Sequence, residues 1–93
     1  MCEVDTPLFT MGQIVATPNA LANLSSAEIT VALGRHQSGD WGDVGDEDRQ
    51  SNNQALVDGT RLLSAYHSGT RVKFWIITEA DRSSTTVLLP EDY

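Results

Sequence analysis

The feature that most constrains this fold is the run at residues 71–79, which is the densest stretch of β-branched and aromatic side chains in the chain. In an extended strand, Phe74 and Ile76 would point to one side, while Trp75 and Ile77 would point to the other. The middle of the run is apolar on both sides and its ends are polar, which is typical of a central strand covered on both faces. We therefore predict that the rest of the chain packs around this strand.

Two more segments with a period of two stand next to this run, at residues 61–67 and 85–89. The links between the three segments are short and contain turn-forming residues, so the strands are expected to form an antiparallel meander. Pro90 ends the last strand, because proline has no N–H to donate to the ladder. Residues 8–16 are a candidate fourth strand, with Gly12 marking a bend.

Signals for helices come earlier in the chain. Thr17 followed by Pro18 is a start signal, because threonine caps helices and proline suits their first position. This pair predicts a short helix at residues 19–24. A second helix follows, with a capping box opened by Ser25 and an expected end at Gly34.

A third helix is predicted from Asp46, acting as its N-cap, to a stop at residues 58–59. Helices that precede a meander indicate an α+β domain, with two or three short helices packed on one face of the sheet. The 93 residues form a single small domain, residues 1–93. Its polar first segment, residues 1–7, is expected to be flexible.

The predicted core follows from these periodicities. The apolar positions that face inward are expected to be largely buried, and at least one of the two tryptophans should join them. These positions are Ile29, Leu33, Leu56, Leu63, Phe74, Ile76 and Val87, with Trp41 or Trp75.

The net charge of −7 is the unusual total of this composition. It argues against direct binding to nucleic acid, whose phosphates require a basic surface. No apolar run reaches the roughly 18 residues of a membrane span, and the first twenty residues lack the features of a signal peptide. Cys2 is the single cysteine, so no disulfide can form within the chain. We expect a cytoplasmic protein without a membrane segment.

The segment between the second and third helices carries the strongest functional signal. It combines glycine turns with a tryptophan and several acids, and loops with fixed turns are frequent binding sites. In the structural alternative, Trp41 covers the sheet while the acids close turns and favour the positive end of the third helix. As a candidate partner-binding surface, this segment contributes Asp40, Trp41, Asp43, Asp46, Glu47 and Asp48.

No metal or cofactor site is predicted. The spaced acids lack the alternating ligands, central glycine and distal glutamate of an EF-hand loop. Cys2, His36 and His67 do not form a zinc-ligand motif.

A catalytic alternative uses His36, His67, Glu79 and Arg82. In compact bacterial ribonuclease and toxin folds, a carboxylate or imidazole takes the 2′-hydroxyl proton while arginine holds the phosphate. The acidic total opposes this role, because a nuclease must bind a polyanion. In the structural alternative, His67 stands at a strand end and the other charged residues lie in a solvated turn.

Several phrases of the chain carry a resemblance. They are residues 12–18 (Gly-Gln-Ile-Val-Ala-Thr-Pro), residues 35–36 (Arg-His), residues 38–43 (Ser-Gly-Asp-Trp-Gly-Asp), residues 61–66 (Arg-Leu-Leu-Ser-Ala-Tyr), and residues 75–83 (Trp-Ile-Ile-Thr-Glu-Ala-Asp-Arg-Ser) running to residues 85–90. Together they resemble a family of small uncharacterised proteins found on plasmids, integrative elements and phage-derived islands, over nearly the whole chain. The resemblance implies a mobile-element setting and supplies no activity.

Members of that family are sometimes labelled a restriction-modification methylation subunit. This chain argues against the label, because it has no glycine-rich cofactor loop after a strand and no Asn-Pro-Pro-aromatic tetrad. It is also too short for a methyltransferase domain.

The expected function is therefore non-enzymatic. We expect an acidic protein-binding module that docks on a host protein with a basic surface, such as a nucleic-acid-handling or defence enzyme. The rivals are the nuclease and an accessory domain without an anti-defence role. The chain is expected to be a monomer or a homodimer, because the edge left by residues 85–89 must be covered by residues 8–16 or by a second subunit.

Overall fold

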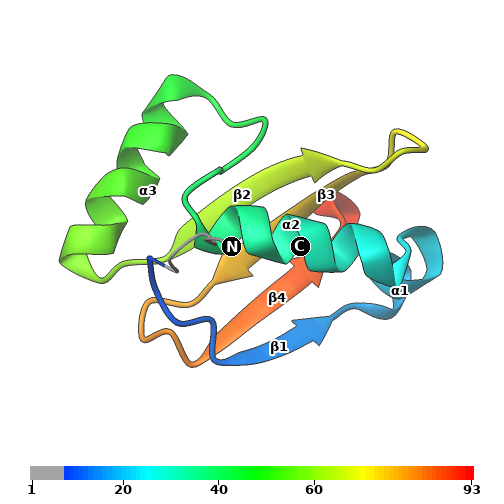
Figure 1. The fold of residues 1–93 in the computed structure, drawn as a ribbon, viewed down its shortest axis with the longest axis horizontal. Coiled ribbons are helices and arrows are strands. Elements are labelled where there is room, and N and C mark those ends of the chain that lie inside the picture. Colours follow the sequence, from blue (N-terminus) through cyan, green and yellow to red (C-terminus); the bar gives the residue numbers. More distant parts are fainter. Residues whose placement is uncertain (1–7) are drawn as a thin grey trace, which may run out of the picture.

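The computed structural model describes residues 8–93, so the predicted flexibility of residues 1–7 lies outside the described residues. Helices and a four-stranded sheet form an α+β fold, as predicted (Figure 1). The elements in chain order are β1 (Gln13–Ala16), α1 (Pro18–Asn23), α2 (Ser26–Gln37), α3 (Asp46–Asp58), β2 (Leu62–His67), β3 (Lys73–Thr78), β4 (Ser84–Leu88) and the 3-10 helix η1 (Pro90–Asp92).

The sheet has the order β1-β4-β3-β2. The predicted antiparallel meander of β2, β3 and β4 is confirmed, and β3 lies in the interior of the sheet. The candidate fourth strand is also present, but it pairs with β4 in parallel, so the sheet is mixed. It is shorter than predicted because Gly12 bends the chain with φ +63°, and a Cβ there would lie 2.3 Å from Ser83 O.

The helix starts follow the predicted caps. Thr17 Oγ1 accepts from Ala20 N, and Ser25 forms a capping box with Glu28. The end of α2 differs from the prediction, because Gly34 lies inside the helix, which continues to Gln37. Glycine in a helix costs about 1 kcal/mol, and the added turn offsets this cost by carrying a fully buried histidine into the core.

The third helix begins one position earlier than predicted. Gly45 occupies the N-cap position without a side-chain hydrogen bond, and Asp46 is the first helical residue. The predicted stop is confirmed, since Gly59 ends the helix with a left-handed φ of 73°.

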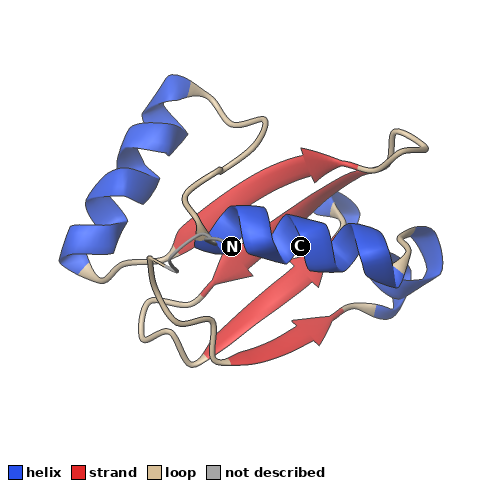
Figure 2. Ribbon diagram, in the orientation of Figure 1, coloured by secondary structure: helices blue, strands red, loops and turns tan. Residues whose placement is uncertain are grey.

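The helices do not all pack on the same face of the sheet. Both α1 and α2 cover one face, whereas α3 stands beside the outer edge of β2 (Figure 2). On the other face, the ring of Tyr93 meets Trp75 at 5.8 Å between centroids, and η1 contacts β3. Among the predicted core residues, Phe74, Ile76, Val87 and Trp41 are buried, while Ile29, Leu33, Leu56, Leu63 and Trp75 are half-buried.

Candidate functional site

The candidate site is the segment between α2 and α3, which lies along the outer edge of β2. Ala65 N donates to Trp41 O over 3.0 Å, and Asp43 N donates to Ala65 O over 2.7 Å. These bonds hold the segment beside β2 as a short parallel bridge. The N-terminal end of α3 is raised away from the sheet (Figure 1). We call the exposed carboxylates of this region the acidic rim: Asp40, Asp43, Asp46, Glu47 and Asp48.

Trp41 does not belong to the exposed surface, because only 3% of it is accessible. Its ring stacks on Phe9 at 6.3 Å between centroids and lies edge-on to His36 at 5.6 Å. Its indole N–H donates to Asn53 Oδ1 over 3.1 Å. This burial corrects the assignment of Trp41 to the partner-binding surface, since a side chain packed in the core has no area left for a partner.

Two carboxylates of the acidic rim are paired with arginines. Asp40 Oδ2 lies 2.8 Å from Arg35 Nε, and Asp46 Oδ1 lies 2.6 Å from Arg49 Nη1. The hydrogen bond from Arg35 holds the pKa of Asp40 below its usual value. All four side chains are about half exposed or more. Solvent therefore screens both pairs, and each contributes at most about 1 kcal/mol to stability.

The other three carboxylates give the acidic rim its uncompensated charge. The Asp43 side chain is 70% exposed, and its Oδ2 lies 3.9 Å from His67 Nδ1. Glu47 and Asp48 are exposed in the first turn of α3, where the positive end of the helix dipole favours carboxylates. Among residues 8–93, neither has a lysine or arginine nitrogen within 4.0 Å of its carboxylate.

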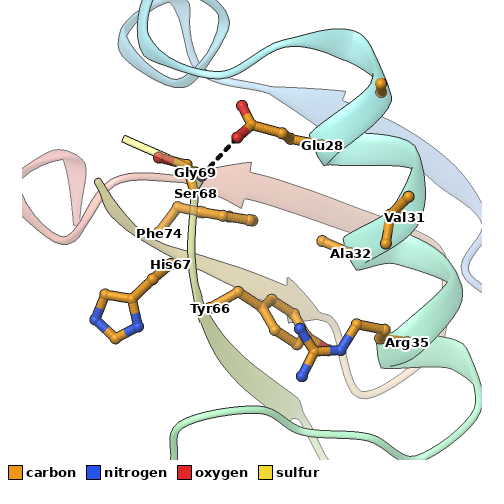
Figure 3. Close-up of a pocket in the computed structure, with 10 residues that line it drawn as sticks. Glu28, Val31, Ala32, Arg35, Tyr66, His67, Ser68, Gly69 and Phe74 are labelled. Atoms are coloured by element: carbon orange, nitrogen blue, oxygen red, sulfur yellow. Dashed lines mark hydrogen bonds between the residues drawn. The ribbon is translucent and has the colours of Figure 1, made fainter. Parts of the chain in front are cut away.

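A pocket of about 290 Å³ opens next to the acidic rim, between α2 and the turn that joins β2 to β3 (Figure 3). Ala32, Tyr66 and Phe74 give it an apolar floor. At one end, Gly69 N donates to Glu28 Oε2 over 2.8 Å, which is the dashed line in Figure 3. This hydrogen bond ties the turn to α2 and closes that end of the pocket.

Arg35 stands at the other end of the pocket. Its guanidinium carbon lies 4.6 Å from the centroid of the Tyr66 ring. Tyr66 Oη donates to Asp40 O over 2.6 Å, and burial raises the pKa of Tyr66 to about 12. Arg35 lines the pocket and also pairs with Asp40, so it connects the pocket to the acidic rim.

The charged residues of the pocket are already engaged within the protein or point away from it. Its volume is at the lower limit of sites that hold small molecules, which is roughly 300 Å³. Glu28 and Arg35 already make hydrogen bonds within the protein, and the ring of His67 points away from the pocket (Figure 3). The apolar floor can therefore accommodate one apolar side chain of a partner.

His36 lies in the core with none of its surface exposed. Thr85 Oγ1 donates to Met11 O over 2.8 Å, so it accepts the hydrogen bond from Thr78 Oγ1. Thr78 Oγ1 must then accept from His36 Nε2 at 2.8 Å, and Ser64 Oγ donates to His36 Nδ1 at 2.5 Å. These directions specify a neutral imidazole protonated on Nε2.

His36 has a structural role in the core. Burial, together with the positive charge of Arg82, lowers its pKa to about 4. Among the described residues, no buried side-chain nitrogen or oxygen lacks a hydrogen-bond partner. The network is thus complete and closed to solvent, so His36 is not placed to act on a substrate.

The four residues of the catalytic alternative do not converge on one accessible site. His67 pairs with Lys73 at one end of the β2–β3 ladder, whereas Glu79 follows the last residue of β3 at the other end. The six steps from Lys73 to Glu79 span roughly 20 Å along a strand. His36 lies toward the Glu79 end, where its ring contacts Thr78 under the helix layer, without access to solvent.

Arg82 is also committed to the fold. Its guanidinium donates to Thr60 O over 2.6 Å and to Ala55 O over 3.1 Å, which ties the β3–β4 turn to the end of α3. It further donates to Glu79 O over 3.2 Å. These carbonyl partners occupy the donors that a phosphate would need.

Sequence reasoning missed the pocket of Figure 3. It singled out Ser25 for the capping box, but not the second contact of Glu28 with Gly69, which is 41 positions away. No local pattern signals such a contact, because it depends on how α2 lies across the sheet.

No group of three or more His, Cys, Asp or Glu residues in the described part of the chain is arranged to hold a metal ion. Within residues 8–93, no helix has both the length and the apolar character needed to cross a membrane. Comparison with protein-family models, with curated protein sequences and with solved structures found no match.

Proposed function

We propose that this protein is a non-enzymatic binding module that presents its acidic rim to a basic surface of a partner protein. The observation that carries the proposal is the exposure of Asp43, Glu47 and Asp48, which have no lysine or arginine partner within residues 8–93. A row of carboxylates can occupy a basic groove and accelerates association at low salt.

The pocket beside the acidic rim supplies the apolar contact that the buried Trp41 cannot. Its floor lies between two acidic sides, with Glu28 at one end and Asp40 near the other. A partner segment that carries an apolar side chain between basic residues is complementary to this arrangement. The apolar side chain would fill the pocket, because well-packed central pockets dominate binding energy.

The first class of partner to test is a nucleic-acid-handling or defence enzyme of the host. Such enzymes carry basic grooves that bind a phosphate backbone. An acidic surface can occupy such a groove by imitating that backbone. The mobile-element setting that directs this choice comes from the family resemblance of the sequence. The rival is an accessory domain whose charge only keeps the protein in solution.

The test is capture of partners from host lysate by two triple variants that each remove three negative charges. The rim variant changes the acids without an arginine partner, and the control variant changes exposed acids elsewhere. Circular dichroism first establishes that both are folded. The rim variant is Asp43→Asn, Glu47→Gln and Asp48→Asn, and the control variant is Asp58→Asn, Glu79→Gln and Glu91→Gln.

We expect the wild type and the control variant to capture the same basic, nucleic-acid-handling protein at low salt and to lose it at high salt. The rim variant should bind that protein about tenfold more weakly, since each surface charge contributes roughly 0.5 kcal/mol. Equal capture by the two triple variants would overturn the role of the acidic rim. Capture that does not weaken as salt increases would do the same.

A further inference from the structure

The outer side of β1 is an open sheet edge. Gln13 N donates to Ser83 O and Thr17 N donates to Val87 O, each over 3.0 Å. Along a strand, the N–H and C=O of successive residues point alternately to one neighbouring strand and to the opposite side. Those of Ile14 and Ala16 therefore point away from β4. Within residues 8–93, no strand pairs with that side of β1.

The opposite edge of the sheet, on β2, is covered by the side chain of Asn52 and by the loop between α2 and α3. Asn52 Nδ2 donates to Leu63 O over 2.7 Å, and Leu63 N donates to Asn52 Oδ1 over 3.1 Å. The outward groups of Ala65 are taken by Trp41 O and Asp43 N. The described chain thus protects β2 from pairing with a strand of another molecule. It leaves β1 open to such pairing, as exposed sheet edges are.

The surface around β1 is apolar and uncharged. Ile14 is 47% exposed, Val15 is 41% exposed and Leu21 is 62% exposed. A groove of about 390 Å³ runs between β1 and the first two helices, and none of the residues that line it is ionisable. In a chain with a net charge of −7, this is a surface where two copies can meet without like charges opposing each other.

We propose that β1 is the interface of a two-fold homodimer, in which the β1 strands of two copies pair antiparallel with Val15 at the centre. In this register Ile14 is opposite the partner's Ala16, and Ala16 is opposite the partner's Ile14. Because the groups of both residues point outward, each pair exchanges two backbone hydrogen bonds. The two four-stranded sheets become one continuous sheet.

The side chains agree with this register. Ile14 meets a small alanine across the interface, so it has room to lie over the groove next to Leu21. On the other face of the sheet, Val15 meets the partner's Val15 in a pair without backbone hydrogen bonds, where the Cα atoms approach to about 4.5 Å. A register shifted by one residue would remove all of these backbone hydrogen bonds, because it places inward-pointing groups against the partner.

Sedimentation of Val15→Lys beside Val57→Lys tests the proposal. Both variants exchange an exposed valine for lysine, but Val57 is 80% exposed on α3, away from β1. We expect wild-type protein and Val57→Lys to sediment as dimers at tens of micromolar, and Val15→Lys to sediment as a 10.1 kDa monomer. Wild-type protein that remains monomeric at several hundred micromolar would overturn the proposal, and so would a Val15→Lys dimer.

Disulfide trapping locates the interface independently of the lysine variant. In a Cys2→Ser background, Val15→Cys places the two thiols opposite each other at the two-fold axis, within the Cα separation that a disulfide spans. Mild oxidation should link most of the Val15→Cys protein into covalent dimers and leave Val57→Cys protein monomeric. Equal linkage of the two variants, or none at position 15, would contradict the β1 interface and assign the open edge to another occupant, such as an extended peptide.

Discussion

At the scale of single residues, His36 couples the stability of the fold to pH. Its folded pKa of about 4 lies below the ordinary value of 6.5, so the unfolded chain binds the proton more tightly. The contribution of neutral His36 to the free energy of unfolding is therefore complete above pH 6.5 and is lost as the pH falls toward 4. The loss is on the order of 3 kcal/mol, at 1.36 kcal/mol for each pKa unit.

Urea unfolding between pH 4.5 and 7.5 measures this effect. The wild type should lose stability steadily as the pH falls, whereas His36→Gln should be less stable at pH 7 but nearly independent of pH above 5. His67→Ala removes an exposed histidine and serves as the control, with the slope of the wild type. An unchanged slope in His36→Gln would show that His36 is not the group that titrates.

Gly42 and Gly59 separate two costs of adding a side chain. Both have a left-handed φ, 78° at Gly42 and 73° at Gly59. A Cβ at Gly42 would lie 2.1 Å from Ala65 O, whereas nothing lies within 4 Å of one at Gly59. Gly59→Ala should cost about 1–2 kcal/mol for its backbone conformation alone. Gly42→Ala should cost several kcal/mol more or prevent folding, as measured by urea unfolding, and equal costs would contradict this contact.

At the scale of elements, Asn52 joins α3 to β2. Its buried amide forms two hydrogen bonds with the backbone of Leu63, as a neighbouring strand would. Asn52→Ala leaves the half-buried N–H and C=O of Leu63 without their partners, at a cost of about 1–3 kcal/mol. It also opens the second sheet edge, so we expect light scattering to detect aggregation.

Ser51→Ala is the matched control for this helix. Ser51 is exposed and adjacent to Asn52 on α3, so both variants gain a similar helix propensity from alanine. Its free energy of unfolding should change by less than about 0.5 kcal/mol, without aggregation. A similar loss in both variants would mean that the bonds to Leu63 do not hold α3 in place.

At the scale of the whole molecule, stability should be unevenly distributed. β3 has a strand on each side and four buried residues, whereas α3 buries only Asn52 and Ala55. Amides of α3 should therefore exchange hydrogen through a partial opening, and those of β3 only through global unfolding. Native-state hydrogen exchange at increasing urea distinguishes the two, and equal protection of α3 and β3 would contradict this expectation.

The type and order of the elements follow from local patterns in the sequence. The period-two pattern of residues 61–89 produced the meander, and the caps at Thr17 and Ser25 located the starts of two helices. These features follow from the sequence because they depend on side chains a few positions apart. The end of α2 was less predictable, because glycine weakens a helix without necessarily ending it. The helix continues past Gly34 because this places His36 in the core.

How distant parts of the chain meet is visible only in the folded protein. The parallel direction of β1, the burial of Trp41 and the hydrogen bonds of His36 all depend on contacts between segments far apart in sequence. The same is true of the open β1 edge and of the pocket beside the acidic rim. Each arises from the packing of several elements together, and no local periodicity encodes the relative placement of segments that approach only when the chain folds.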